Sequence, residues 1–232
     1  MIPLPGRWTL RPPRGSCLMD LNAISDRLEL LRGADPRRRT FGADAHEYRL
    51  RPPATEGEVA AFEAEHRIRL PGEYRDFLTK LGNGGAGPCY GLFSLRIFGD
   101  DPDPSQQEGM IGDLARPFPH ESAWNAGADY WDAAPDPNVD EDAWQAWREE
   151  YWSSHLIDGA LPICHEGCGY FALLIITGAD RGRIWRDGRA SDAGIMPVAG
   201  PGGVPITFGS WYAHWFDEVS RERKLPPFID AF

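Results

Sequence analysis

Apolar residues recur at helical spacing in the first third of the chain. One face of an expected helix is formed by Leu21, Ile24, Leu28 and Leu31, and Gly33 can end this helix. A second helix follows Thr55, because the hydroxyl of Thr55 and the carboxylate of Glu58 can cap each other's backbone amides. A third helix occupies residues 71–82, which begin with proline and end with glycine. These patterns predict one helix near the start and two capped helices in tandem.

The second half of the chain has the pattern of a sheet followed by a helix. Residues 161–164 and 169–177 are apolar and flank a turn at 165–167, so they predict a β-hairpin. Residues 170–176 are apolar at every position, which is typical of a central strand buried on both faces. Further elements are expected as short strands at 46–51, 89–98, 183–185 and 195–198, and as helices at 140–152 and 208–219. Helices and strands are segregated along the chain, so the fold class is α+β rather than alternating βαβ.

Negative charge is concentrated in one segment of the chain. The 232 residues carry a net charge of −11, yet residues 100–158 alone hold 15 acids and two arginines, while the rest of the chain sums to +2. The same segment contains five of the nine tryptophans. An acidic surface with aromatic anchors attracts and holds a basic protein. The alternative is a solvated acidic loop whose aromatic side chains pack inward.

Candidate contact residues follow from this segment and from the expected sheet. The expected anchors are Trp131, Trp144 and Trp147, with Asp140, Asp142, Glu149 and Glu150 steering the partner's approach; Glu166, Trp185 and Asp187 are added for the sheet face and its turns.

Motifs that carry chemistry are weak in this chain. Residues 82–87 fit G-x-G-x-x-G, but they follow a helix and open a strand, so they predict a structural turn and not a dinucleotide site. The run Cys164-His165-Glu166-Gly167-Cys168 is favoured as a hairpin turn over a metal site or a redox pair, because no second cysteine pair accompanies it. Nucleophile-elbow, metalloprotease and Walker motifs are missing from the sequence. We therefore expect no enzyme, no cofactor and no metal. A hydrolase or metal enzyme with an unrecognised site stays an alternative.

Composition indicates the cellular location and limits the class of partner. The four cysteines are too few for a disulfide framework, and neither a secretory leader nor a membrane-spanning run is expected, which favours a cytoplasmic location. The acidic balance argues against nucleic-acid binding.

Two stretches resemble the Smi/Knr branch of the SUKH superfamily. The first, 46–95, contains Leu-Pro-x-x-Tyr at 70–74, Gly-Asn-Gly-Gly at 82–85 and Tyr-Gly-Leu at 90–92; the second, 161–215, contains the expected hairpin and the final aromatic helix. The resemblance implies an α+β fold with one central, mostly antiparallel sheet and helices packed around it. It also implies protein binding without catalysis, since bacterial members are regarded as immunity proteins that neutralise toxin domains and others as regulatory scaffolds.

The expected domain organisation has three parts. An N-terminal arm and helix occupy 1–40, the family domain occupies 41–224 with the acidic insertion at about 99–158, and a tail occupies 225–232. Insertions on a fixed scaffold commonly carry binding specificity. The leading hypothesis is a bacterial immunity protein that binds a basic toxin domain, for example a nuclease. The alternative is a regulatory scaffold that binds an endogenous partner.

Overall fold

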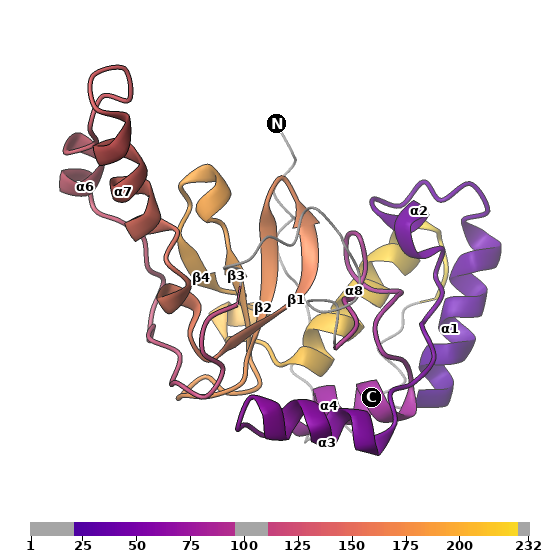
Figure 1. Ribbon diagram of the computed structural model, residues 1–232. Helices are drawn as coiled ribbons and strands as arrows, with labels where there is room; N and C mark the ends of the chain where they lie inside the picture. Colours follow the sequence, from indigo (N-terminus) through magenta and orange to yellow (C-terminus); the bar gives the residue numbers. More distant parts are fainter. Residues whose placement is uncertain (1–20, 96–110, 227–232) are drawn as a thin grey trace.

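A computed structural model describes residues 21–95 and 111–226 (Figure 1). Its α-helices are α1 (Leu21–Ala34), α2 (Ala43–His46), α3 (Glu56–Glu65), α4 (Gly72–Lys80), α6 (Ala128–Asp132), α7 (Glu141–Tyr151) and α8 (Phe208–Glu222), with short 3-10 helices η1 (Ser154–Ile157), η2 (Arg189–Ser191) and η3 (Pro201–Gly203). The strands are β1 (Ala160–Gly167), β2 (Tyr170–Ile175), β3 (Ile184–Asp187) and β4 (Ile195–Pro197). The expected arm at 1–19, the acids at 100–108 and the end of the tail lie outside the described residues.

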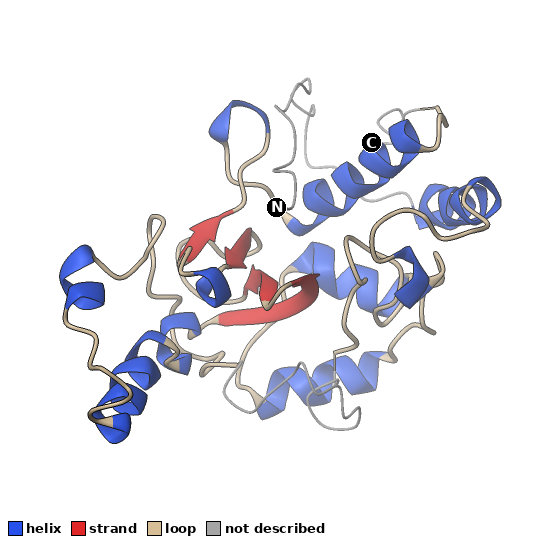
Figure 2. Ribbon diagram, turned by 90° about the horizontal axis from the view of Figure 1, so that it is seen from above, coloured by secondary structure: helices blue, strands red, loops and turns tan. Residues whose placement is uncertain are grey.

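The four strands form one antiparallel sheet in the order β1-β2-β3-β4, which confirms the α+β class and the single sheet. Strand β2 is buried on both faces, as its apolar sequence predicts. Ala172 and Leu174 face the core that includes α1, α3, α4 and α8, while Leu173 and Ile175 pack with Trp185 on the other face. Seen from two directions, the sheet lies between α1 on one side and the α6–α7 segment on the other (Figures 1 and 2).

Both outer strands of the sheet are covered by irregular segments of the chain itself. Beside β1, the amide of Phe93 donates to the carbonyl of Ile163 at 2.9 Å. Beside β4, the amides and carbonyls of Trp124 and Ile195 exchange two hydrogen bonds of 2.8 Å. These pairs satisfy backbone groups that an open edge would offer to another strand.

The capping box predicted at Thr55 is confirmed, whereas α1 continues through Gly33, its expected end, to Ala34. The amide of Glu58 donates to the Thr55 hydroxyl at 3.2 Å, and the amide of Thr55 donates to the Glu58 carboxylate at 2.7 Å. Asp140 caps α7 by accepting a hydrogen bond from the amide of Ala143 at 2.9 Å. The helix expected at 140–152 therefore forms, and so do the helices expected near the N-terminus, after Pro71 and at the end of the domain.

The strand expected at 46–51 is wrong. The chain ends α2 at His46, and Glu47 and Tyr48 then take left-handed φ angles of 50° and 57°. The Tyr48 side chain is buried, and its hydroxyl donates to Asp35 at 2.9 Å. The alternating pattern of residues 46–51 therefore belongs to a turn and not to a strand. Only Leu50 forms a bridge, with Gly85.

The strand expected at 89–98 is also corrected within the described residues. Cys89 and Gly91 have φ angles of 50° and 92°, which interrupt extended backbone, and Leu92 alone bridges to its neighbours. A side chain at Gly91 would meet the carbonyl oxygen of Gly85 at 2.4 Å, so this close approach requires glycine. The structural turn predicted at 82–87 is confirmed, while β1 extends to Gly167 and the expected turn at 165–167 moves to 167–169.

Asp35 joins the end of α1 to the α2 loop and to the end of α8. Its buried carboxylate accepts hydrogen bonds from the amides of Arg39 at 2.9 Å and Thr40 at 3.0 Å and from the Tyr48 hydroxyl. The guanidinium of Arg223 lies 3.6 Å away. Burial raises the pKa of Asp35, but these hydrogen bonds and Arg223 outweigh it and hold the pKa at about 2.

This low pKa predicts an acid-sensitive contact. A carboxyl whose folded pKa lies below its unfolded value of 3.8 stabilises the fold above that value, and the stabilisation is lost as the pH falls toward 2. The free-energy difference of unfolding between the wild type and Asp35→Asn should therefore shrink by about 2 kcal/mol between pH 5 and pH 2. Urea denaturation over this range measures it. The control is Asp26→Asn, an exposed change on α1; a difference for Asp35→Asn that stays constant with pH contradicts the assignment.

Candidate functional site

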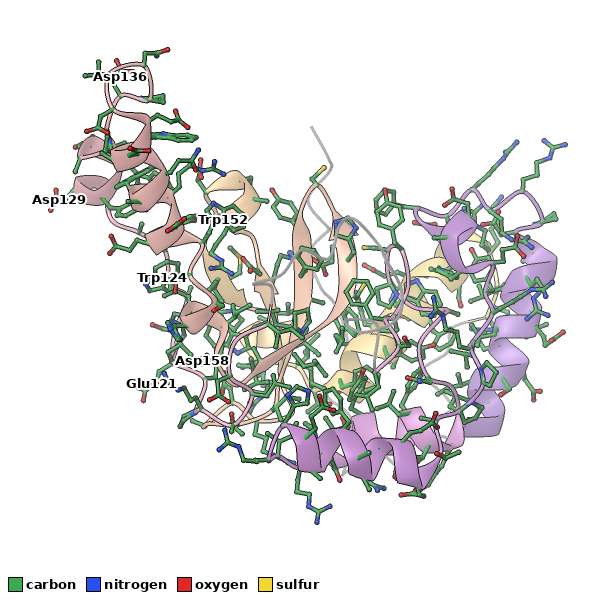
Figure 3. All side chains as sticks on the ribbon, viewed as in Figure 1. Glu121, Trp124, Asp129, Asp136, Trp152 and Asp158 are labelled. Atoms are coloured by element: carbon green, nitrogen blue, oxygen red, sulfur yellow. The ribbon has the colours of Figure 1, made fainter. Side chains whose placement is uncertain are left out.

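Residues 127–152, here called the acidic hairpin, contain α6, α7 and the loop between them. The acidic hairpin projects from the side of the sheet beyond β4 (Figure 1). It leaves the fold just after Trp124 and returns through Trp152, which lies at its base, while Asp136 lies on the loop farthest from the sheet (Figure 3). Its position therefore exposes it along most of its length.

The surface of the acidic hairpin is strongly negative. It carries eight carboxylates and a single arginine, and all eight acidic residues are exposed: Asp129, Asp132, Asp136, Asp140, Glu141, Asp142, Glu149 and Glu150. Among the described residues, none of the eight takes part in an ion pair. The guanidinium of Arg148 lies instead over the ring of Trp144, 4.6 Å from its centroid. This concentrated charge is left available to a cationic partner.

Aromatic side chains hold the two helices of the acidic hairpin together. The rings of Tyr130 and Trp147 stack with centroids 4.6 Å apart, and those of Trp131 and Tyr151 meet edge to face at 4.9 Å. The indole N–H of Trp147 donates to the carbonyl of Tyr130 at 3.1 Å, and that of Trp131 donates to Ala126 at 3.2 Å. Both indoles therefore shape the hairpin from within, and only part of each ring remains accessible.

Three other apolar side chains are better placed for contact. Trp144 is half-buried on α7, and Trp152 remains 39% exposed at the base. Val139, in the loop before α7, is 83% exposed. Sequence reasoning counted Trp152 but missed Val139, whose only signal is a lone apolar residue between acids.

Seven of the ten predicted contact residues lie on the acidic hairpin, where α7 and its N-cap bring six of them together. Asp142, Glu149 and Glu150 are exposed, and Asp140 is both exposed and the helix cap. Trp131 and Trp147 pack against each other and against Tyr130, whereas Trp144 lies against Arg148.

The other three predicted residues require correction. Trp185 is completely buried, packs edge to face on Phe118, and donates its N–H to Asp180 at 2.9 Å. Asp187 is buried in an ion pair with Arg189. The side chain of Glu166 is nearly buried against Arg186. Strand β3 is an inner strand whose second face is covered, so Trp185 and Asp187 offer no surface to a partner.

The Cys164–Cys168 run belongs to the β1–β2 hairpin, but residues 164–166 lie in strand β1 and the turn begins at Gly167. Cys164 is buried and its thiol donates to the carbonyl of Pro88 at 3.1 Å, while Cys168 is exposed at the turn. Burial raises the pKa of the Cys164 thiol well above its usual value. Within 21–95 and 111–226, His, Cys, Asp and Glu form no group of three or more that could hold a metal ion.

Of three comparisons with known proteins, one gave a match, to a protein family. Neither the curated proteins nor the solved structures gave a match. In the described part of the chain, no helix has both the length and the apolar character needed to cross a membrane. A model of the SMI1 / KNR4 family (SUKH-1) matches residues 53–199, a range that runs from before α3 to beyond β4 and includes the acidic hairpin. Because this match covers more than half of the chain, the protein belongs to the SMI1 / KNR4 family (SUKH-1).

Proposed function

We propose that this protein is a bacterial immunity protein that binds and neutralises a basic toxin domain through the acidic hairpin. Family membership supports a protein-binding module in general. The immunity role is what the sequence resemblance implies for bacterial members. The observation that carries the choice of surface is the set of eight exposed carboxylates, without ion pairs among the described residues, on an aromatic-cored hairpin.

The charge of the acidic hairpin suits a partner that handles nucleic acid. A nuclease needs a positive surface to hold phosphates, and carboxylates can occupy the same surface and exclude the substrate. Opposite charge also speeds association. The protein then acts by covering the toxin's site and needs no catalytic group of its own. The proposal places the complex in the cytoplasm, where a nuclease meets its substrate.

The residues of the acidic hairpin have different proposed roles in binding. The carboxylates face solvent and are suited to steering a partner at long range. Trp144, Trp152 and Val139 offer apolar area that a partner can cover. Trp131 and Trp147 give the hairpin a fixed shape through their ring contacts and hydrogen bonds.

Neutralising the hairpin should abolish capture of the partner. The full-length protein is used as bait in lysate of its source cells, beside a variant with Asp140→Asn, Asp142→Asn, Glu149→Gln and Glu150→Gln. We expect the wild type to retain a basic protein at low salt and release it at high salt, because exposed charges are screened. The variant should lose this protein, and co-expression of the wild type should relieve the growth arrest that the captured protein causes.

The matched control removes four exposed acids elsewhere: Asp26→Asn, Glu29→Gln, Asp44→Asn and Glu222→Gln on α1, α2 and α8. It has the same net charge as the test variant and should keep the partner. Capture of a non-toxic complex that persists in salt and ignores the hairpin acids contradicts the proposal and favours a regulatory scaffold.

Substitutions of Trp144 and Trp147 should distinguish a residue that contacts the partner from one that maintains the shape of the acidic hairpin. Trp144→Ala should weaken partner binding about tenfold with little change in Tm, because half-buried interface tryptophans carry much of the binding energy. Trp147→Ala should instead loosen the hairpin, because it removes the stack on Tyr130 and a hydrogen bond. Titration calorimetry and thermal unfolding measure both effects. Leu30→Ala, at an exposed leucine of α1, is the control; unfolding by Trp144→Ala refutes its contact role.

A further inference from the structure

A buried arginine connects the acidic hairpin to the sheet. Arg189 lies two residues after the end of β3 and is 2% exposed. Its Nε and Nη2 donate to the two carboxylate oxygens of Asp187 at 2.9 and 2.7 Å. Its Nη1 donates to the carbonyls of Tyr151 and Ser153, each at 3.1 Å. One side chain thus joins β3 to the C-terminal end of α7.

These contacts account for the burial of a charged group. A buried guanidinium is costly unless it is paired and its N–H groups have acceptors. Asp187 supplies the countercharge. The carbonyl of Tyr151, at the negative end of the α7 dipole, and the carbonyl of Ser153 just beyond the helix supply acceptors. The ring of Trp152 lies 5.4 Å from the guanidinium and adds a cation–π contact. Removal of Arg189 therefore leaves Asp187 and two carbonyls without these partners.

The other end of the acidic hairpin is held by the same β3–β4 connection. Trp124 pairs with Ile195 in a two-bond bridge. The side-chain amide of Asn125 donates to the carbonyl of Asp192 at 2.6 Å and accepts a hydrogen bond from the Tyr151 hydroxyl at 2.8 Å. Both ends of the hairpin are consequently fixed to residues 187–195.

Past this base, the acidic hairpin stands away from the sheet and from α1, α3 and α4 in both views (Figures 1 and 2). Its direction therefore depends on the base. We infer that Arg189 is a positioning residue that sets the direction in which the acidic hairpin leaves the sheet, and so presents its carboxylates and Trp144 to a partner. The anchoring is independent of the proposed function, whereas its consequence for binding rests on it.

Hydrogen exchange tests the anchoring in the full chain without a partner. We expect Arg189→Met to lower the protection of amides in 141–153 at least tenfold and to leave β1 and β2 protected. Arg189→Lys should give an intermediate loss, because lysine keeps the charge but cannot donate to all of these acceptors at once. This conservative variant keeps the test informative where methionine prevents folding.

Arg186→Met is the matched control. Arg186 lies on β3, forms an ion pair with Glu166, and its substitution changes the net charge equally. It should leave the hairpin amides protected. Unchanged amide protection in Arg189→Met overturns the inference, because Arg189 then does not anchor the hairpin. The same loss of protection in both variants also overturns it, because the loss then reflects general destabilisation.

Binding measurements on the same variants distinguish the anchoring role of Arg189 from the proposed role of the acidic hairpin. The probes are the basic protein captured by the wild-type bait and poly-L-lysine, which senses charge alone. Arg189→Met should raise the dissociation rate of the captured protein about tenfold. Its association rate should stay within twofold of the rate for Arg186→Met, and the two variants should bind poly-L-lysine equally well. A loosened hairpin with unchanged binding of the captured protein supports the anchoring and refutes the hairpin interface.

Discussion

Strand β2 must be covered on both faces, and the rest of the molecule follows from that requirement. Its side chains alternate between two apolar clusters, so two layers of chain have to lie against it. Helices α4 and α8 supply one layer. Residues near Phe118 and Ile157 supply the other, together with Trp185 of the neighbouring strand. The chain between Phe118 and Ile157 is longer than this layer needs, and 127–152 leaves the core as the acidic hairpin.

This arrangement separates stability from recognition. The fold depends on buried apolar side chains and on a few buried carboxylates such as Asp35 and Asp187, each with several partners. The carboxylates of the acidic hairpin lie outside that network, and Asp140 alone among them caps a helix end. Charges on such an insertion can change without disturbing the scaffold, which is the usual condition for a surface that determines specificity.

Sequence patterns predicted what depends on near neighbours. The capping box at Thr55, the helix after Pro71 and the apolar run of β2 each rest on local spacing, and each is confirmed. Exposure of the hairpin acids also follows from sequence, because unpaired charges are rarely buried. The strand expected around Tyr48 failed because a contact with Asp35, 13 residues earlier, favours a turn.

The failures at the site have the same origin. Alternation along β3 cannot tell which layers will cover it, so Trp185 was expected at the surface although the Phe118 segment buries it. The role of Arg189 depends on Tyr151, 38 residues earlier, and no local pattern relates the two. Contacts between distant segments therefore limited the prediction.

The most direct test of the central claim is a hydrogen-exchange footprint of the protein alone and in complex with its captured partner. The account predicts that the amides gaining protection concentrate in 127–152 and that those of α1, α3 and α8 remain unchanged. Protection gained on those helices, with the acidic hairpin exchanging as in the free protein, would contradict it.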